Sequence, residues 1–582
     1  MSSSLRALDR YRRLLARYLR ADWPRIVLLA LILAASIAVQ VATPLVASRF
    51  INDAVTRAPM RDLVTLALLT MALALLGQGF AIAETWIAER VAWDATNALR
   101  LDLLAHLLRL DSGYHAARTQ GELIERVDGD VSTLARFFSR FVINVIGNAL
   151  LIVVVLALLL RVDWRVGLGL AAFVAIAMLA MLRIRSTSTH HWSSERQGGA
   201  DFYGFLGEYL AGLEDVRSSG AGAFVLRRFA MAMRTWLGAI RRAQMRGYAL
   251  VATSDGLFGL GAAFALALCA MLYRDGALTL GAVYLIFRYT EMLRQPTERL
   301  RDEVQDFQQA DASIGRVEAL LAEAPRIVDG PGEALPAGPL GVAFDGVTFA
   351  YGDAPVLQDV TIDIAPGRVL GLVGRTGSGK TTLTRLMPRF HDPDAGAVRL
   401  GGVDIRDVRL AALRERIGLV TQDVHLFDAS VRDNLTLFDD TVPDARIIAA
   451  IEALGLGAWL RALPAGLDTA IGAGGAGLSA GQAQVLTCAR VLLRDPDIVI
   501  LDEASSRLDP ATERLVQRAL GRLLEGRTGV IVAHRLATLA LADDIVVMED
   551  GRVAEHRSRL DLAADPDSRF ARLLRTAEEV TA

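Results

Sequence analysis

The stretch Val369-Leu-Gly-Leu-Val-Gly374-Arg-Thr-Gly-Ser-Gly-Lys380-Thr381 decides the fold of the second half of this chain. Its apolar run, its glycines and the pattern that follows predict a strand, a loop and a helix in that order. The glycines let backbone N–H groups converge on phosphate oxygens, and the helix N-terminus favours negative charge. We therefore expect a phosphate-binding loop in an α/β domain of the P-loop NTPase class. The expected nucleotide-binding residues in this loop are Gly374, Arg375, Thr376, Gly377, Ser378, Gly379, Lys380, Thr381 and Thr382.

Lys380 is the only lysine among the 63 lysine and arginine residues of the chain. It stands where a compact, mobile ammonium group suits the terminal phosphates better than a planar guanidinium fork. Thr381 next to it offers a hydroxyl to Mg²⁺. This exception to the use of arginine strengthens the prediction of a nucleotide site.

A second strand signal, Ile498–Leu501, ends in Asp502 and Glu503. Seen alone, two acids at the end of a strand are usually a solvated turn. Together with a phosphate loop they suit a Mg²⁺ site and a water-orienting carboxylate. We expect Asp502 to serve the metal and Glu503 to act as general base or water-orienter.

Composition divides the chain of 582 residues into a membrane half and a water-soluble half. The hydrophobic share is 53%, and long apolar runs crowd the first 300 residues. A formal net charge of −2 gives no indication of a nucleic-acid partner. The predicted membrane spans are Ile26–Ser48, Leu63–Trp86, Phe141–Leu160, Val166–Leu182, Ala249–Tyr273 and Leu280–Leu293.

Arginine placement predicts that both ends of the chain are cytoplasmic in a cell membrane. The two long internal connections lack proline and keep helical spacing, so we expect helices that extend into the cytosol and turn at Asp111–Arg118 and Tyr209–Arg217. The expected domains are an amphipathic N-terminal helix over 1–24, a six-helix membrane domain over 25–322, a linker over 323–340 and a nucleotide-binding domain over 341–575.

Further motifs make the chain similar to exporter-type half-transporters of the ATP-binding cassette family. Leu478-Ser479-Ala480-Gly481-Gln482 resembles the family signature, and Gly121–Asp130 resembles a pattern of the membrane half. The other matches are Tyr351 for adenine stacking, Gln422 of the Q-loop, Asp509 of the D-loop and His534 as switch histidine. The resemblance implies a helical subdomain that carries the signature.

This resemblance implies ATP and Mg²⁺ as cofactors, with ATP held between two cassettes. Gln422 would then link the metal site to the membrane half, and His534 would contact the γ-phosphate. Ser479, Ala480, Gly481 and Gln482 would complete the site of a partner chain, so a dimer is required for hydrolysis.

Three departures from the family pattern concern the signature. Ala473 stands where exporters commonly carry glutamate, Ala480 replaces a glycine, and Ala483 replaces a basic residue. A weakened signature beside intact Walker acids favours a heterodimer with a second half-transporter over a homodimer.

Ionisable residues in the predicted fifth and sixth spans are candidates for a substrate cavity, because charge is costly in a bilayer. They are Asp255, Arg288 and Glu291, and Asp255 could instead pair with Arg294 at a similar depth. The leading hypothesis is export of an amphipathic small molecule, drug or lipid. The alternatives are a lipid flippase, a nucleotide-gated regulator and an importer on the same fold.

Overall fold

The computed structural model describes residues 18–421, 424–472, 475, 477–502, 510–533 and 536–581. They belong to two compact units. Unit 1 comprises Met1–Leu108 and Thr119–Glu323, and unit 2 comprises Arg109–Arg118 and Ala324–Ala582. Most of the predicted N-terminal amphipathic helix lies outside the described residues.

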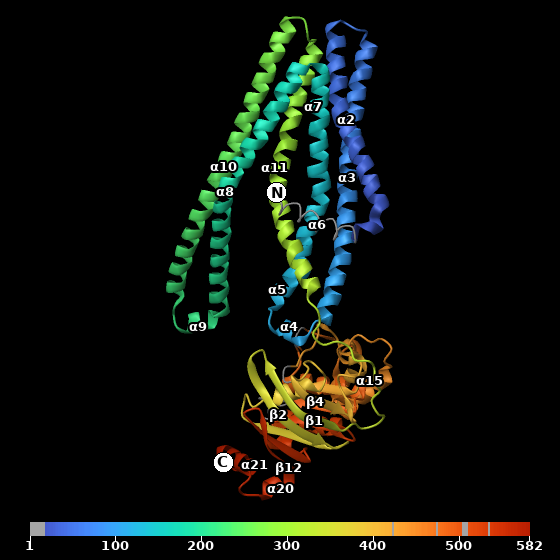
Figure 1. Ribbon diagram of the computed structural model, residues 1–582, viewed down its shortest axis with the longest axis vertical. Coiled ribbons are helices and arrows are strands. Elements are labelled where there is room, and N and C mark those ends of the chain that lie inside the picture. Colours follow the sequence, from blue (N-terminus) through green and yellow to red (C-terminus); the bar gives the residue numbers. More distant parts are fainter. Residues whose placement is uncertain are drawn as a thin grey trace. The chain divides into compact units, whose positions relative to one another are not determined.

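Unit 1 consists of long helices (Figure 1). In chain order they are η1 (Arg20–Asp22), α2 (Trp23–Val55), α3 (Met60–Arg109), α5 (Gln120–Ile124), η2 (Glu125–Gly129), α6 (Asp130–Arg140), η3 (Phe141–Gly147), α7 (Asn148–Val162), α8 (Trp164–Ala211), α9 (Leu213–Ser218), α10 (Gly222–Arg274) and α11 (Leu280–Ala322). Side-chain caps fix two of the starts. The Asp163 carboxylate accepts from the backbone N–H of Arg165 at 2.8 Å, and the Thr279 hydroxyl accepts from that of Ala282 at 3.2 Å.

In the part of the chain that the structure describes, five helical segments are long and apolar enough to cross a membrane. They overlap the first five predicted spans, the fourth of which ends one residue beyond its segment, and the third begins in the π-helix η3 rather than in a regular α-helix. The predicted sixth span, in α11, is not among them and remains a prediction. Its Leu285, Ile286, Tyr289 and Leu293 are nevertheless buried in one core with residues of α2, α7, α8 and α10.

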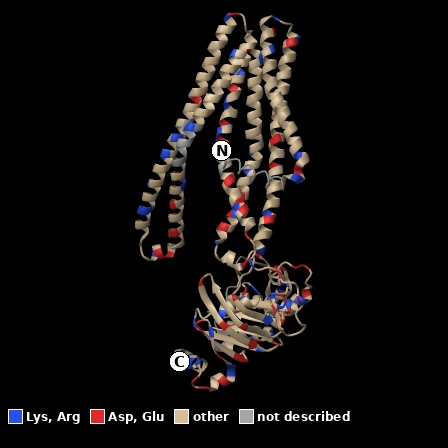
Figure 2. Cartoon of the chain, in the orientation of Figure 1, with Lys and Arg blue, Asp and Glu red and all other residues tan. Residues whose placement is uncertain are grey.

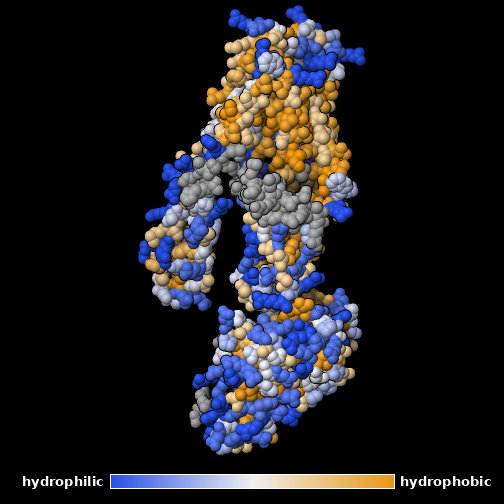
Figure 3. Space-filling view, viewed as in Figure 1, coloured by the Kyte–Doolittle hydropathy of each residue, from blue (hydrophilic) through white to orange (hydrophobic). Residues whose placement is uncertain are grey.

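The surface of unit 1 is apolar along the predicted spans and charged beyond them. Figure 2 shows few charged residues along the apolar stretches of its helices, and Figure 3 shows the same region as a continuous hydrophobic band. Towards the end of the hairpin formed by α8, α9 and α10 the surface becomes hydrophilic and charged. This pattern is typical of helices that leave a bilayer and continue into water.

The two long internal connections are helical, as predicted. The first turn contains the short helix α4 (Ser112–Ala116), and the second contains α9. The first turn belongs to unit 2, although the expected domain limits place it in the membrane domain. The Asp111 carboxylate explains this assignment, because it accepts backbone hydrogen bonds from Arg326 at 2.6 Å and Ile327 at 3.2 Å.

Unit 2 is built on sheets covered by helices (Figure 1). Its strands are β1 (Val342–Tyr351), β2 (Ala354–Ile364), β3 (Val369–Gly374), β4 (Ala395–Leu400), β5 (Val403–Asp404), β6 (Ile417–Val420), β7 (Ala429–Ser430), β8 (Ala470–Ile471), β9 (Ile498–Asp502), β10 (Thr528–Val532), β11 (Asp544–Glu549) and β12 (Arg552–Ser558). The other helices are α12 (Lys380–Leu386), α13 (Leu410–Glu415), α14 (Val431–Thr436), α15 (Asp444–Ala453), α16 (Gly457–Ala462), η4 (Gly466–Asp468), α17 (Ala480–Arg494), α18 (Pro510–Leu524), α19 (Leu536–Leu539), α20 (Arg559–Ala564) and α21 (Arg569–Thr581).

The main sheet has the strand order β12-β11-β3-β10-β9-β6. Strands β11, β3, β10, β9 and β6 are mutually parallel, so their carboxyl ends lie at one edge. A second sheet, β2-β1-β4-β5, is antiparallel and shares a hydrophobic core with β3 and α12. Ligands of open α/β sheets bind outside the carboxyl ends of the parallel strands, so this edge positions the site.

Candidate nucleotide site and polar groups of the membrane unit

The predicted phosphate loop lies between the carboxyl end of β3 and the start of α12. Gly374 (φ 155°) and Gly379 (φ 99°) adopt backbone conformations that favour glycine. Neither position has room for a side chain. A Cβ on Gly374 would lie 2.3 Å from the Met548 carbonyl oxygen, and one on Gly379 would lie 2.6 Å from Leu357 Cδ2. The glycine spacing therefore sets the path of the loop.

Lys380 opens α12 and is only 5% exposed. Its ammonium group lies inside the loop, where Nζ donates to the carbonyl oxygens of Gly374 at 2.7 Å and Arg375 at 2.9 Å. Ser378 and Thr382 of the same loop are also buried. This places a positive charge within the loop, where it can meet an anionic ligand.

The hydroxyl of Thr381 lies 3.5 Å from the carboxylate of Asp502, measured from Oγ1 to Oδ1. The strand β9 places Asp502 at the sheet edge from which α12 begins, so two residues that are 121 positions apart in the chain lie close together. Hydroxyl and carboxylate oxygens are ligands that Mg²⁺ accepts. Within the described ranges no group of three or more His, Cys, Asp and Glu side chains could hold a metal, so an ion here would depend on phosphate and water oxygens as well.

Four predicted residues, Gln422, Glu503, Asp509 and His534, lie outside the described residues. Three of these residues follow described strands closely in the chain. Gln422 comes two residues after β6, Glu503 directly follows β9, and His534 comes two residues after β10. The roles of these four residues stay predictions.

Tyr351 ends β1 and is 42% exposed, which leaves its ring available for stacking. Phe349 and His391 hold it from the side, each edge to face, with ring centroids at 5.0 Å and 5.3 Å. Burial lowers the pKa of His391, and the positive charge of Arg385 lowers it further, while Asp111 and the neighbouring Asp392 act in the opposite direction. His391 thus lies between the Tyr351 ring and the first internal turn, where a Cβ on Gly113 would be 3.8 Å from its Cε1, an arrangement that sequence reasoning missed.

The predicted signature forms the start of α17. Ser479 accepts a hydrogen bond from the backbone of Gln482 at 3.2 Å, and the Gln482 side chain accepts one from the backbone of Ser479 at 2.9 Å. Gly481 is buried, and a Cβ added there would meet Thr512 Cγ2 at 1.9 Å. Ser479 and Ala480 are exposed at the helix N-terminus, where backbone N–H groups can receive an anion.

In unit 1 the candidate cavity residues of α10 and α11 form ion pairs. Asp255 pairs with Arg294, which also lies 3.3 Å from Glu298, and Arg288 pairs with Glu291 at 2.8 Å. The predicted alternative in which Asp255 pairs with Arg294 is therefore confirmed. Each member of these pairs keeps a side-chain exposure between 27% and 49%, so the pairs form a polar surface opposite the buried face of α11.

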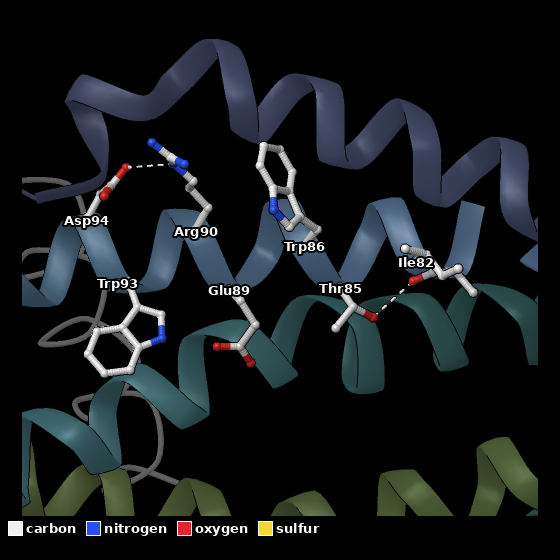
Figure 4. Close-up of a pocket in the computed structure, with 8 residues that line it drawn as sticks. Ile82, Thr85, Trp86, Glu89, Arg90, Trp93 and Asp94 are labelled. Carbon is white, nitrogen blue, oxygen red and sulfur yellow. Dashed lines mark hydrogen bonds and ion pairs between the residues drawn. The ribbon is translucent and has the colours of Figure 1, made fainter. Parts of the chain in front are cut away.

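Sequence reasoning missed an open cavity of about 800 Å³ along one side of α3 (Figure 4). Its lining includes Trp86, Trp93, Glu89, Arg90 and Asp94. Arg90 lies 5.8 Å above the Trp86 ring and 3.9 Å from the Asp94 carboxylate, and Figure 4 shows both neighbours on its side of the helix. The available signal was the cluster of charges and tryptophans at the end of the second predicted span.

Glu84 was also missed. It lies within the predicted span Leu63–Trp86, yet it is only 6% exposed and faces α2 through the hydroxyl of Ser36. A charge inside an apolar run was the available signal.

Comparisons with known proteins agree with this geometry. The family description "ABC transporter" matches residues 357–506, and "ABC transporter transmembrane region" matches residues 26–297. The "ATP-dependent lipid A-core flippase" of Chromobacterium violaceum is 34% identical over 483 residues, which are 82% of this chain and 81% of that protein. The "Fatty acid ABC transporter ATP-binding/permease protein" of Mycobacterium bovis is 31% identical over 487 residues, which are 80% of this chain and 74% of that protein.

A solved structure is also similar to this chain. It is the "Structure of a bacterial Atm1-family ABC exporter with ATP bound", with a TM-score of 0.80 and 27% identity. The match covers 95% of this chain and 98% of that chain.

Proposed function

We propose, from the premise that this chain belongs to the ATP-binding cassette transporter family, that it moves a lipid-like amphiphile across a membrane. Membership of the family and the exporter fold establish that the chain hydrolyses ATP and uses it to drive export. The multi-pass membrane location follows from the matched transmembrane region. The substrate, the metal and the partner chain are the parts that we propose.

The polar surface of α11 carries the substrate proposal. Arg288, Glu291 and Arg294 follow one another at spacings of three residues and are exposed, while Ile286 and Tyr289 on the other face are buried. Paired charges beside apolar helix surfaces suit a molecule with a polar head and hydrocarbon chains. Two of the relatives named above bear printed names that refer to lipid A-core and to fatty acids, which supports this class of substrate.

Thr381 and Asp502 are the described residues that would hold Mg²⁺. Bound there, Mg²⁺ would supply positive charge that offsets the negative charge of the phosphates. Lys380 and the loop backbone bind the phosphates, Tyr351 stacks on the base, Glu503 orients the attacking water, and His534 contacts the γ-phosphate.

The partner chain is the next part of the proposal. Large apolar side chains are exposed along the hairpin of α8, α9 and α10, and exposed patches of this kind mark protein interfaces. They include Tyr203 at 61%, Leu210 at 59%, Phe224 at 49% and Leu226 at 68%. The exposed start of α17 is a second surface that is available to bind a partner chain. We infer that two chains associate and that each signature completes the nucleotide site of the other.

A homodimer of this chain is the simplest assembly in which each signature completes the nucleotide site of the other chain. The departures at Ala480 and Ala483 had favoured a heterodimer, but the capping box between Ser479 and Gln482 is intact, and Ala483 packs against the core of the cassette. Ala473 lies outside the described residues. Steady ATP hydrolysis by the purified chain, with light scattering to measure the mass of the assembly, tests this part. A monomer, or a dimer without activity until another half-transporter is added, would favour the heterodimer.

The substrate is tested by ATPase stimulation in nanodiscs with a panel of lipids, drugs and peptides. The proposal expects stimulation by amphiphiles with hydrocarbon chains and little effect of water-soluble peptides. Arg288→Gln and Glu291→Gln should reduce the stimulation, whereas the basal rate should persist. Stimulation by hydrophilic compounds alone would contradict the proposal.

A further inference from the structure

Glu84 is the acidic group of the membrane unit whose surroundings demand an explanation. It lies on α3, is 6% exposed, and its Oε1 is buried without a hydrogen-bond partner. The helix α2 covers it from the other side, where Ser36 is 1% exposed. The neighbouring cluster of Leu29, Ile87 and Ala88 is apolar.

The polar contacts of Glu84 form a short chain of hydrogen bonds. The Gln40 side chain donates to the hydroxyl of Ser36 at 3.2 Å. Ser36 is in turn the hydrogen-bonding neighbour of the Glu84 carboxyl group. These two neighbours are neutral, so neither can balance a negative charge on Glu84.

Charged residues on the neighbouring elements include Arg25 on α2, Glu89 and Arg90 on α3, Arg140 at the end of α6 and Glu303 on α11. Arg25 pairs with Asp22 and Asp94, and Glu303 accepts a hydrogen bond from Asn144. Among the described residues no ion pair reaches Glu84. By contrast, Asp255, Glu291 and Glu298 of α10 and α11 each have an arginine partner.

An ionised carboxylate without a cation is strongly disfavoured in such a place, whereas burial of the neutral acid is disfavoured far less. We propose that Glu84 is a proton-binding site, which holds a proton while α2 and α3 are packed and gives it up when ATP-driven rearrangement hydrates their interface. On release, the O–H bond of the acid breaks, its electron pair stays on the carboxylate, and water takes the proton. Proton release follows the ATP-driven rearrangement and therefore rests on the proposed function. Proton binding at Glu84 in the packed state does not rest on it.

Infrared spectroscopy of the purified protein in nanodiscs tests the protonated state without any turnover. At neutral pH the wild type should show the carbonyl stretch of a buried carboxylic acid, with the small downshift that exchange into heavy water causes. Glu84→Gln, which resembles the neutral acid in shape, should lack this band. Glu89→Gln, on the exposed side of the same helix, should retain it. A spectrum of Glu84→Gln that matches the wild type in this region would overturn the proposal.

Labelling with a hydrophobic carbodiimide provides a second test that needs no variant. This reagent reacts with protonated carboxyl groups in apolar surroundings. Trypsin releases Asp62–Arg90 as one peptide, which contains both Glu84 and the control Glu89. Fragmentation should find the label on Glu84 several-fold more often than on Glu89. Equal labelling of the two would contradict a protonated Glu84.

The coupling to ATP is tested by repeating the labelling in Glu503→Gln with and without ATP and Mg²⁺. The closed, ATP-bound state should lose labelling at Glu84. If labelling without ATP is as expected but ATP leaves it unchanged, proton release during the cycle is wrong and the proton site itself stands. A failure of ATP to bind in that variant would instead count against the proposed function.

Discussion

Thr381 Oγ1 lies 3.5 Å from Asp502 Oδ1, although 121 residues separate the two in the chain. The contact joins the start of α12 to the end of β9 at the edge of the sheet where the phosphate loop opens. Because both groups carry oxygen ligands, the pair is the feature of the described residues that most favours a Mg²⁺-dependent site.

Asp502→Asn should therefore raise the Mg²⁺ concentration needed for half-maximal ATPase activity. The change keeps the size of the side chain and removes its charge, so ATP binding without Mg²⁺ should change little. A magnesium titration of the ATPase rate checks this, with Asp439→Asn, an exposed residue of a surface turn, as the control. An unaltered titration in Asp502→Asn would exclude the assigned role.

Lys380→Arg should weaken ATP binding about as much as Lys380→Ala does, although it preserves the charge. Lys380 is 5% exposed, and its ammonium group is held by two loop carbonyls at 2.7 and 2.9 Å, which leaves little space for a planar guanidinium group. We expect at least a tenfold loss in affinity, or ~1.4 kcal/mol. Binding of a fluorescent ATP analogue measures it, and wild-type affinity in Lys380→Arg would contradict this account of the loop.

Gly481→Ala should abolish hydrolysis by displacing the signature helix. The added Cβ would lie 1.9 Å from Thr512 Cγ2, which forces α17 and α18 apart. Thr512→Ala removes that methyl group, so the double variant should recover part of the ATPase rate. Thr512→Ala alone serves as the control. An active Gly481→Ala variant would contradict this prediction. So would a double variant with Thr512→Ala that recovers no activity, because the contact of Gly481 with Thr512 would then not explain the requirement for glycine.

Protein stability should depend on pH through His391. Because burial and Arg385 lower its pKa below the ordinary 6.5, the unfolded chain binds more protons at His391 than the folded chain does. The resulting loss of stability is absent above about pH 6.5, grows as the pH falls and is complete below the pKa in the folded protein. The thermal midpoint of the wild type should thus fall more than that of His391→Asn between about pH 7.5 and about pH 5.5. The exposed His556→Asn should behave as the wild type does. Parallel curves for wild type and His391→Asn would refute the effect.

Exchanging the charges of Asp255 and Arg294 tests the ion pair between α10 and α11. Asp255→Arg and Arg294→Asp should each lower substrate-stimulated ATPase activity, because each leaves two like charges facing one another. The double exchange should restore most of it. An absence of recovery would show that the positions matter for something other than their pairing.

The sequence was most informative where backbone geometry is encoded locally. The phosphate loop could be predicted because Gly374 and Gly379 occupy places where no other side chain fits. The signature could be predicted for the same reason, since Gly481 allows close packing and Ser479 with Gln482 forms a local capping box.

The pair of Asp255 with Arg294 is an exception, but most contacts between distant segments could not be predicted in this way. Asp111 binds the backbone of Arg326, 215 residues later, and nothing in its neighbourhood in the sequence signals that partner. Glu84 depends on Ser36, which faces it because two separate helices pack in one particular register. Patterns of apolar residues predict that such helices exist, but not which residues meet across them.

The most direct test of the central claim measures lipid movement and ATP hydrolysis together in proteoliposomes that contain only this chain. With ATP and Mg²⁺, wild-type protein should move a fluorescent lipid between leaflets at a rate that follows ATP hydrolysis. Glu503→Gln should bind ATP yet neither hydrolyse it nor move lipid. Lipid movement without ATP, or near-wild-type turnover in Glu503→Gln, would contradict the account.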